Sequence, residues 1–176
     1  MAKYHIYTDG SSRGNPGAGG WSMIVMDEND TSIIFAQSDY EDHVTNNRME
    51  LKGMLSALDY AADNPKDTFS IYSDSAYVVN SCNSWLRNWA SNGWRNSKKQ
   101  LVENIDLMKE LWRYLSKDFF NAEVIKCDGH KGHVGNELAD ALATADTDKF
   151  EDLITYWELK VPLSLAPAGD DWFPID

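Results

Sequence analysis

The chain has 176 residues, 43% of them hydrophobic, which is enough to build one globular domain around a core. Its net charge of −12 argues against a surface that is basic throughout, and no apolar run is long enough to cross a membrane. The first residues lack the apolar stretch of a secretory signal, and two cysteines are too few for a disulfide framework. We therefore expect a monomer in the reducing cytoplasm, without a membrane partner.

The N-terminal part of the sequence predicts three strands. The alternating run KYHIYTD indicates a strand from Lys3 to about Thr8, closed by Asp9 and followed by a glycine-rich loop. The runs WSMIVM and SIIFAQ have the same strand-like character, and the turn-like DENDT separates them. This spacing favours a three-stranded antiparallel meander.

Helical periodicity begins at TNNRMELKGMLSALDYAADNP. The pattern stops at Asn64-Pro65, because a proline disfavours helical backbone in the residue before it. A short strand, TFSIYSD, follows and ends at Asp74, and SAYVVNSC predicts a short helix. The apolar stripe of the long helix consists of Leu51, Met54, Leu55, Leu58 and Ala62.

The second half of the chain predicts a polar segment, a strand and two helices. Residues 83–99 are polar, rich in tryptophan and interrupted by Gly93. NAEVIKC predicts the last strand and GNELADALATA the last helix; past about Thr147 the pattern weakens, and VPLSLAPAGDDWFPID is typical of a loose appendage. Between the polar segment and the last strand, QLVENIDLMKELWRYLSK predicts an amphipathic helix that buries Leu101, Ile105, Met108, Leu111, Trp112 and Leu115.

Together these elements indicate an α/β fold, with a mixed sheet and helices on both faces. Sites in open sheets of this kind form at the carboxyl ends of strands. Two of the predicted strands end in an acid, Asp9 and Asp74.

Three of four candidate acidic residues have a simple explanation without a function. Asp74 could cap a helix, Glu50 could complement a helix dipole, and Asp140 could be solvated surface. Taken together they favour a metal site, because Asp9 and Asp74 at adjacent strand ends would repel each other unless a cation neutralised them. Such hard oxygen ligands suit Mg²⁺ or Mn²⁺, and pairs of these ions serve phosphodiester hydrolysis.

The segments YTDGSSRGNPGAGGW, TNNRMEL, YSDSAYV and GHKGHVGNELADALA resemble, in order, the signature segments of type 1 ribonuclease H, and they cover roughly Lys3 to Ala145. The resemblance implies the ribonuclease H-like fold, a mixed five-stranded sheet whose first three strands are antiparallel. It places the catalytic domain at residues 1–147 and an acidic extension at 148–176. The implied activity is endonucleolytic cutting of the RNA strand of RNA–DNA hybrids, leaving 5′-phosphate and 3′-hydroxyl ends.

The resemblance also implies a set of catalytic residues. Two Mg²⁺ ions, with Mn²⁺ as the alternative, would bind to four carboxylates, and Asp9 would bridge them. His130 would assist proton transfer or product release, which its near-neutral titration suits. The metal-binding carboxylates are Asp9, Glu50, Asp74 and Asp140.

The loop KCDGHKGH holds an alternative, because Cys127, His130 and His133 recur at three-residue intervals like zinc ligands. A thiolate would be an odd ligand beside carboxylates meant for hard ions, and the family's spacing His-x-Gly-x-x-Gly-Asn-Glu-x-Ala-Asp selects His130. Asp128 stands where the family usually has a basic residue. It could hold a cation, raise the pKa of His130 or weaken the contact with RNA.

Contacts with the hybrid are implied at two places. Gly10 and Ser11 would present backbone amides near the RNA, and Thr45 would help hold a phosphate of the DNA strand. Side chains that match family positions contacting the hybrid are Asn15, Asn46 and Asn47.

Residues from about 81 to 100, the handle, resemble the family's substrate-binding handle through SWLRNWASNGW. No acid occurs from Ser75 to Val102, whereas Arg87, Arg95, Lys98 and Lys99 are basic. The tryptophans could fill a core, or they could pack on sugars and bases while the cations neutralise phosphates. Because the whole chain is acidic, we expect weak, strongly salt-dependent hybrid binding. The expected DNA-strand contacts are Trp85, Trp89, Trp94, Arg87, Lys98 and Lys99.

The sequence is also compatible with other functions. The chain could be a different nuclease of the same broad fold, a non-catalytic hybrid-binding module or a structural domain of a polymerase assembly. From Asp146 to Asp176 there are eight acids against two lysines. This tail could strap onto the domain or be disordered, or its end, GDDWFPID, could dock on a replication protein or fold back over the handle.

Overall fold

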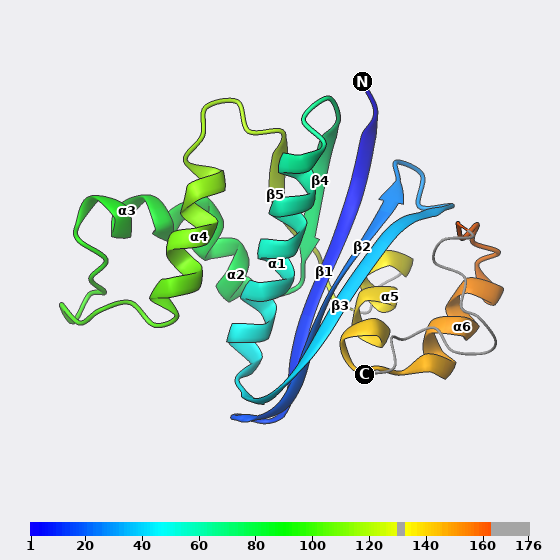
Figure 1. Ribbon diagram of the computed structural model, residues 1–176, viewed down its shortest axis with the longest axis horizontal. Coiled ribbons are helices and arrows are strands. Elements are labelled where there is room, and N and C mark those ends of the chain that lie inside the picture. Colours follow the sequence, from blue (N-terminus) through cyan, green and yellow to red (C-terminus); the bar gives the residue numbers. More distant parts are fainter. Residues whose placement is uncertain (130–132, 163–176) are drawn as a thin grey trace.

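A mixed sheet of five strands runs through the centre of the computed structural model, which describes residues 1–129 and 133–162 (Figure 1). The strand order is β3-β2-β1-β4-β5; β1 pairs antiparallel with β2, β2 antiparallel with β3, and β4 parallel with both β1 and β5. This confirms the predicted fold class. The strands are β1 (Lys3–Gly14), β2 (Gly17–Asp27), β3 (Ile33–Val44), β4 (Thr68–Ser73) and β5 (Ala122–Lys126).

The first strand is longer than predicted. The glycine-rich segment is not a loop, because Gly10–Gly14 continues β1 and pairs with Gly17–Trp21 of β2 as a long hairpin. Parallel pairing of β1 with β4 stops at Tyr7 and Tyr72. Asp9 therefore lies inside β1, but just beyond the point where its neighbour β4 ends.

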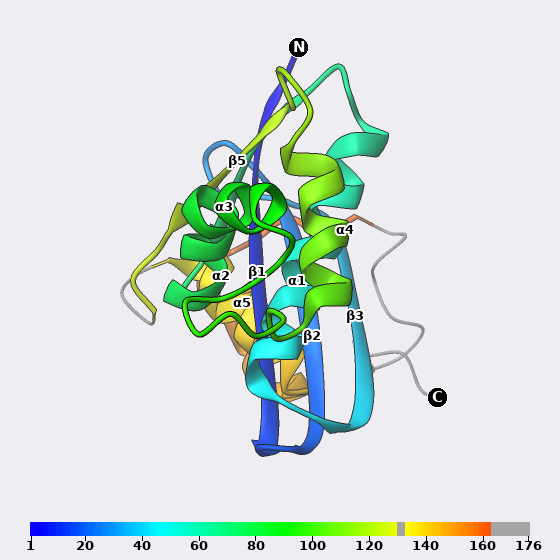
Figure 2. The ribbon, with the colours of Figure 1, turned by 90° about the vertical axis from the view of Figure 1, so that its left-hand side faces the viewer.

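One face of the sheet is covered by α1 (Asn46–Asp63), α2 (Ala76–Asn80), a π-helical turn η1 (Ser81–Trp85), α3 (Leu86–Ser91) and α4 (Ile105–Leu115). Figure 2 looks onto the side that carries α2, α3 and α4. The apolar stripes of α1 and α4 pack with β1 and β4 in one buried cluster. Burial of these stripes stabilises the layer, since each large apolar side chain removed from water contributes about 1.5–3 kcal/mol.

The start predicted for the fourth helix was wrong. Helix α4 begins at Ile105 and not at Gln100, because Asn104 adopts a left-handed backbone with φ of 55°. The preceding residues form an isolated bridge between Arg95 and Leu101. Leu101, predicted to be buried, is 54% exposed, and Val102 takes the buried place instead.

The opposite face carries α5 (Val134–Ala143) and α6 (Thr147–Tyr156), both at the right of Figure 1. Helix α6 was not predicted. Its N-terminus is capped by Asp146, whose side chain accepts from the Lys149 amide at 3.1 Å, and Phe150 is buried against the α5 residues Leu138 and Leu142. After α6, Lys160 forms a parallel bridge with Ser32 at the start of β3.

Helix α6 and the bridge at Lys160 thus pack against the domain. They do not test the strap or disorder alternatives for the end of the tail. The GDDWFPID end lies outside the described residues, so its docking alternatives remain predictions. Among the helices that the structure describes, none has both the length and the apolar character needed to span a bilayer.

Candidate active site

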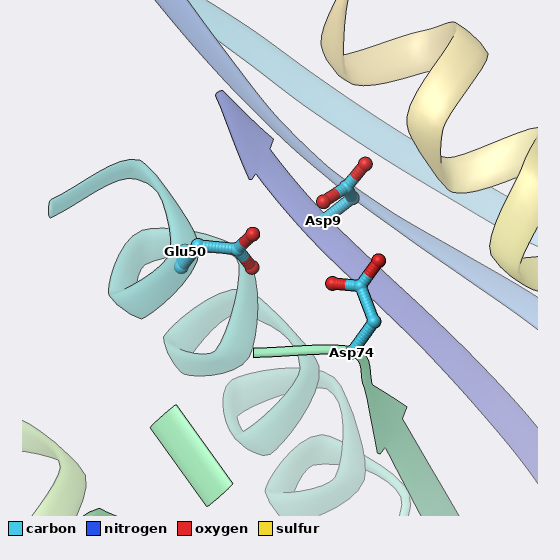
Figure 3. Close-up of side chains that lie close together, drawn as sticks. All are labelled: Asp9, Glu50 and Asp74. Atoms are coloured by element: carbon cyan, nitrogen blue, oxygen red, sulfur yellow. The ribbon is translucent and has the colours of Figure 1, made fainter. Parts of the chain in front are cut away.

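Three of the four predicted metal ligands converge at the end of the parallel strand pair (Figure 3). Asp9 projects from β1, Asp74 directly follows β4, and Glu50 comes from α1. One carboxylate oxygen of each lies within 4.8 Å of those of the other two. The residues come from distant parts of the sequence, and β1, β4 and α1 bring them together.

Two glycines let α1 approach β1 closely enough to deliver Glu50. A Cβ atom on Gly10 would collide with the backbone of Met49, and one on Gly53 would lie 2.9 Å from the carbonyl oxygen of Asp9. Any larger residue would push the helix away from the strand. The glycine beside Asp9 in the motif YTDG therefore has a packing role at the site.

The cluster is largely removed from solvent, with Asp9 buried and Glu50 and Asp74 half-buried, and its carboxylates repel one another without a cation. Asp9 is 6% exposed, and its pKa is raised to about 8, first by burial and then by the charges of Asp74 and Asp140. Burial and the neighbouring Asp9 and Asp74 also raise the pKa of Glu50 well above its usual value. The Gly10 amide donates to Asp9 Oδ1 at 2.9 Å, which favours the ionised carboxylate.

One oxygen of the cluster has no hydrogen-bond partner among the described residues: the buried Glu50 Oε2. A buried acceptor left unpaired costs free energy, and this one lies among like charges. Hard oxygen ligands grouped in this way fit Mg²⁺ or Mn²⁺, and a bound cation of this kind would neutralise the repulsion among the carboxylates.

The structure argues against two of the single-residue explanations. The cap of α2 is Ser75, whose hydroxyl accepts from the Val78 amide at 3.2 Å, so Asp74 is free of that task. Glu50 lies beyond the first turn of α1, which contains no acid.

Asp140 lies on α5 beside the cluster rather than within it. It is close enough to raise the pKa of Asp9, but its Oδ2 atom forms an ion pair with Lys149 Nζ of α6 at 2.7 Å. Asp140 is thus neither solvated surface alone nor a fourth member of the close group. Its role as a metal ligand remains a prediction.

The histidine loop is described only in part. His130 lies outside the described residues, and His133 is exposed directly before α5. Gly129 packs against the cluster, since a Cβ there would lie 3.1 Å from Asp74 Oδ2. Asp128 is exposed, and the three roles predicted for it remain predictions.

Cys127 behaves as a structural thiol. It is buried, its pKa is raised to about 11 by burial and by Asp74, and Asn136 Nδ2 donates to its Sγ at 3.7 Å. A thiol that holds its proton at neutral pH is a poor metal ligand, because zinc binds the thiolate.

A polar network joins the β1–β2 hairpin to the start of α1 beside the carboxylates. The Asn46 amide donates to Asn15 Oδ1 at 3.0 Å, and the Ser12 amide donates to Asn46 Oδ1 at 2.6 Å. Thr45 caps α1 by accepting from the Arg48 amide. Hydrogen bonds that involve backbone amides thus hold three of the predicted hybrid contacts, Asn15, Thr45 and Asn46, in one place.

The remaining predicted contacts in this area differ in exposure. Asn47 is exposed and Ser11 is partly exposed, whereas Gly10 is buried and directs its amide at Asp9. The Gly10 amide is therefore already used within the site, and its contact with RNA remains a prediction.

The tryptophans of the handle divide between two environments. Trp85 is 38% exposed, while Trp89 and Trp94 are partly buried against the main core. Trp85 and Trp89 are neighbours, with ring centroids 5.7 Å apart, and Lys109 lies over the Trp94 ring. The core explanation thus holds in part for two rings. The cations Arg87, Lys98 and Lys99 are exposed.

Lys149 lies at the site but was not predicted from the sequence, because its helix was not predicted. A signal was present: Asp146 stands at a capping position three residues before Lys149, and Phe150 begins a short apolar stripe.

The fold and the site together define an α/β domain with a carboxylate cluster, built around the buried Asp9, that is suited to divalent cations. The family model for RNase H matches residues 1–148. Ribonuclease H of Jannaschia sp. (strain CCS1) is 42% identical over 147 residues, covering 82% of this chain and 91% of the relative. The chain therefore belongs to the ribonuclease H family and is an enzyme of that kind.

Solved structures agree with this assignment. The solution structure of the PFV RNase H domain is 26% identical, with a TM-score of 0.71, and the match covers 82% of this chain and 94% of that one. The foamy viral protease-reverse transcriptase, solved in complex with an RNA/DNA hybrid, shares the fold with a TM-score of 0.68 at 24% identity, over 82% of this chain and 19% of that one.

Proposed function

We propose that the enzyme is an endonuclease that hydrolyses the RNA strand of RNA–DNA hybrids with two divalent ions, leaving 5′-phosphate and 3′-hydroxyl ends. The observation that carries this proposal is the group of Asp9, Glu50 and Asp74, in which Asp9 is buried and the other two are half-buried, with ligand oxygens within 4.8 Å of one another. Family membership and the hybrid bound by the foamy viral relative support the choice of substrate.

The three clustered carboxylates and Asp140 would hold the ions, Mg²⁺ by preference and Mn²⁺ as the alternative. When bound, such ions supply Lewis-acid activation of water and neutralise charge on the phosphate. The protein fixes the ligands beforehand: the Gly10 amide orients Asp9, and the contact of α1 with β1 sets the position of Glu50. His130, which lies outside the described residues, would assist proton transfer or product release.

The hybrid would contact two surfaces. The network of Asn15, Asn46 and Ser12 offers amide and hydroxyl groups that suit the 2′-hydroxyl of RNA. The handle offers the exposed Trp85 and its neighbouring cations to the DNA strand. A net charge of −12 opposes this contact and makes it salt-sensitive.

The test is a cleavage assay on matched RNA–DNA, RNA–RNA and DNA–DNA duplexes, with Mg²⁺ and with Mn²⁺. We expect cutting of the hybrid alone, and none by Asp9→Asn. End-labelled products should be extended by a polymerase from their 3′-hydroxyls. Equal cutting of all three duplexes, or full activity in Asp9→Asn, would contradict the proposal.

We further propose that the enzyme acts as a monomer in the cytoplasm; its two cysteines, both unpaired, fit a reducing compartment. The division into a catalytic domain at residues 1–147 and an extension at 148–176 remains a proposal. So does a contact of the extension with a replication protein. Removing residues 163–176 and measuring partner binding tests that contact, and unchanged binding would remove it.

A further inference from the structure

Lys149 of α6 reaches the one predicted metal ligand that lies outside the close cluster. Its Nζ atom lies 2.7 Å from Asp140 Oδ2, and the two side chains are 31% and 30% exposed. The helix holds the lysine in place at both sides, since Asp146 caps the Lys149 amide and Phe150 is buried. The ion pair is therefore set by the packing of α6 on α5.

The pairing is selective among the acids of the site. Four ion pairs occur among the described residues, and the other three are His5–Asp30, Arg48–Asp106 and Lys52–Glu41. None involves Asp9, Glu50 or Asp74. Lys149 is thus the cation that neutralises the cluster's neighbour, while the cluster itself has none within the part of the chain that the structure describes.

An ammonium and a divalent cation compete for the same carboxylate oxygen. The partly exposed lysine can release Asp140 at modest cost, because partly exposed ion pairs contribute little and four methylenes allow its ammonium group to move into water. The clustered carboxylates need no such release. A divalent ion held by Asp140 should therefore bind more weakly than one held by the cluster of Asp9, Glu50 and Asp74.

We propose that Lys149 is an internal counter-ion of the metal site. It pairs with Asp140 while no metal ion is bound there, and it must move away from Asp140 before a metal ion can bind. Lys149 is then a positioning residue that weakens the ion bound on the Asp140 side and leaves the ion bound by the cluster unaffected. This inference rests on the proposed two-ion function.

The test measures ion binding without substrate, by calorimetric titration with Mg²⁺ and by the paramagnetic resonance of bound Mn²⁺. In Lys149→Met the weaker site should tighten about fivefold, because one competing charge is gone and the aliphatic stem remains. Lys149→Arg should bind ions like the wild type. If the wild type shows one ion only, Lys149→Met should reveal the second.

Lys160→Met is the matched control. It removes the same charge from the same segment, but its backbone bonds to Thr31 and Ile33 at the far end of the sheet from Asp9. Ion binding should not change in this variant. In an Asp140→Asn background, Lys149→Met should likewise have no effect. Circular dichroism checks that α6 remains folded, and Lys149→Gln serves if the Met variant does not fold.

The outcomes separate this inference from the proposed function. Unchanged affinities in both Lys149→Met and Lys149→Gln would overturn the counter-ion role while leaving the metal site intact. Absence of any divalent-ion binding, or full binding in Asp9→Asn, would instead contradict the proposed function.

Discussion

The carboxylate cluster and the handle are opposite in burial and in charge. The cluster places one buried and two half-buried acids together, and the contact of α1 with β1 fixes the position of Glu50 beside Asp9. The handle places exposed cations around an exposed ring, Trp85, on a segment without an acid. Charges in the first region act at short range in a low dielectric, whereas those in the second are screened by salt. Chemistry should therefore depend on the cluster, and affinity on the handle.

The largest expected effect comes from removing one charge of the cluster. Asp9→Asn should lower the rate of hybrid cleavage on the order of 10³-fold or more, because a ligand oxygen that stabilises transition-state charge is lost. Single-turnover cleavage measures the step directly. Asp42→Asn, an exposed acid on β3, is the control and should retain its rate. A comparable loss in both variants would show that net charge, and not the cluster, matters.

The second prediction concerns stability in the absence of divalent ions. Burial and the neighbouring acids raise the pKa of Asp9 to about 8 in the folded chain, whereas the unfolded chain releases this proton near the ordinary pKa of 3.8. The folded state binds more protons between these values, so stability falls as pH rises from about 4 to 8. Glu50 is shifted in the same direction.

Urea unfolding with a chelator at pH 5 and pH 8 measures this effect. Relative to Asp9→Asn, the wild type should lose on the order of 3 kcal/mol across that interval, and Mg²⁺ should restore much of it. Parallel pH profiles for the two proteins would mean that the cluster carries no such repulsion.

Much of the cluster could be predicted from the sequence, because its determinants are local. Asp9 and Asp74 each follow a short alternating run, and the motifs around them carry the family resemblance. The continuation of β1 past Asp9 could not be predicted, since glycines have low strand propensity and their pairing with β2 is long-range. Register across the hairpin, not local preference, makes that segment a strand.

The ion pair of Asp140 and the handle illustrate what the sequence could not predict. Lys149 reaches Asp140 only because Phe150 anchors α6 against α5, a tertiary contact between separate helices. In the handle, Trp85 and Trp89 are four residues apart in the sequence, and their rings are neighbours in the structure. The spacing could not tell which ring would remain exposed, because that depends on packing against Tyr77 and the core.

The third prediction tests the handle by its exposed ring. Trp85→Ala should weaken hybrid binding about 5- to 30-fold, the usual loss when one stacking aromatic is removed, with little change in the rate at saturating substrate. Trp157→Ala is the matched control, because that ring is 46% exposed but follows α6 on the other face of the sheet. Fluorescence anisotropy with Ca²⁺ in place of Mg²⁺ gives the affinity. Equal losses in both variants would remove the handle's special role.

The smallest expected effect concerns one charge of the handle. Arg87→Ala should weaken hybrid binding about two- to fivefold near 0.1 M salt and should reduce the slope of log affinity against log salt by about 1. Lys66→Ala, an exposed cation in the turn after α1, should leave the slope unchanged. The rate at saturating hybrid should be the same in all three proteins, because Arg87 belongs to the exposed, screened region. If Arg87→Ala instead lowered that rate with the salt slope intact, the division between a catalytic cluster and a binding handle would fail.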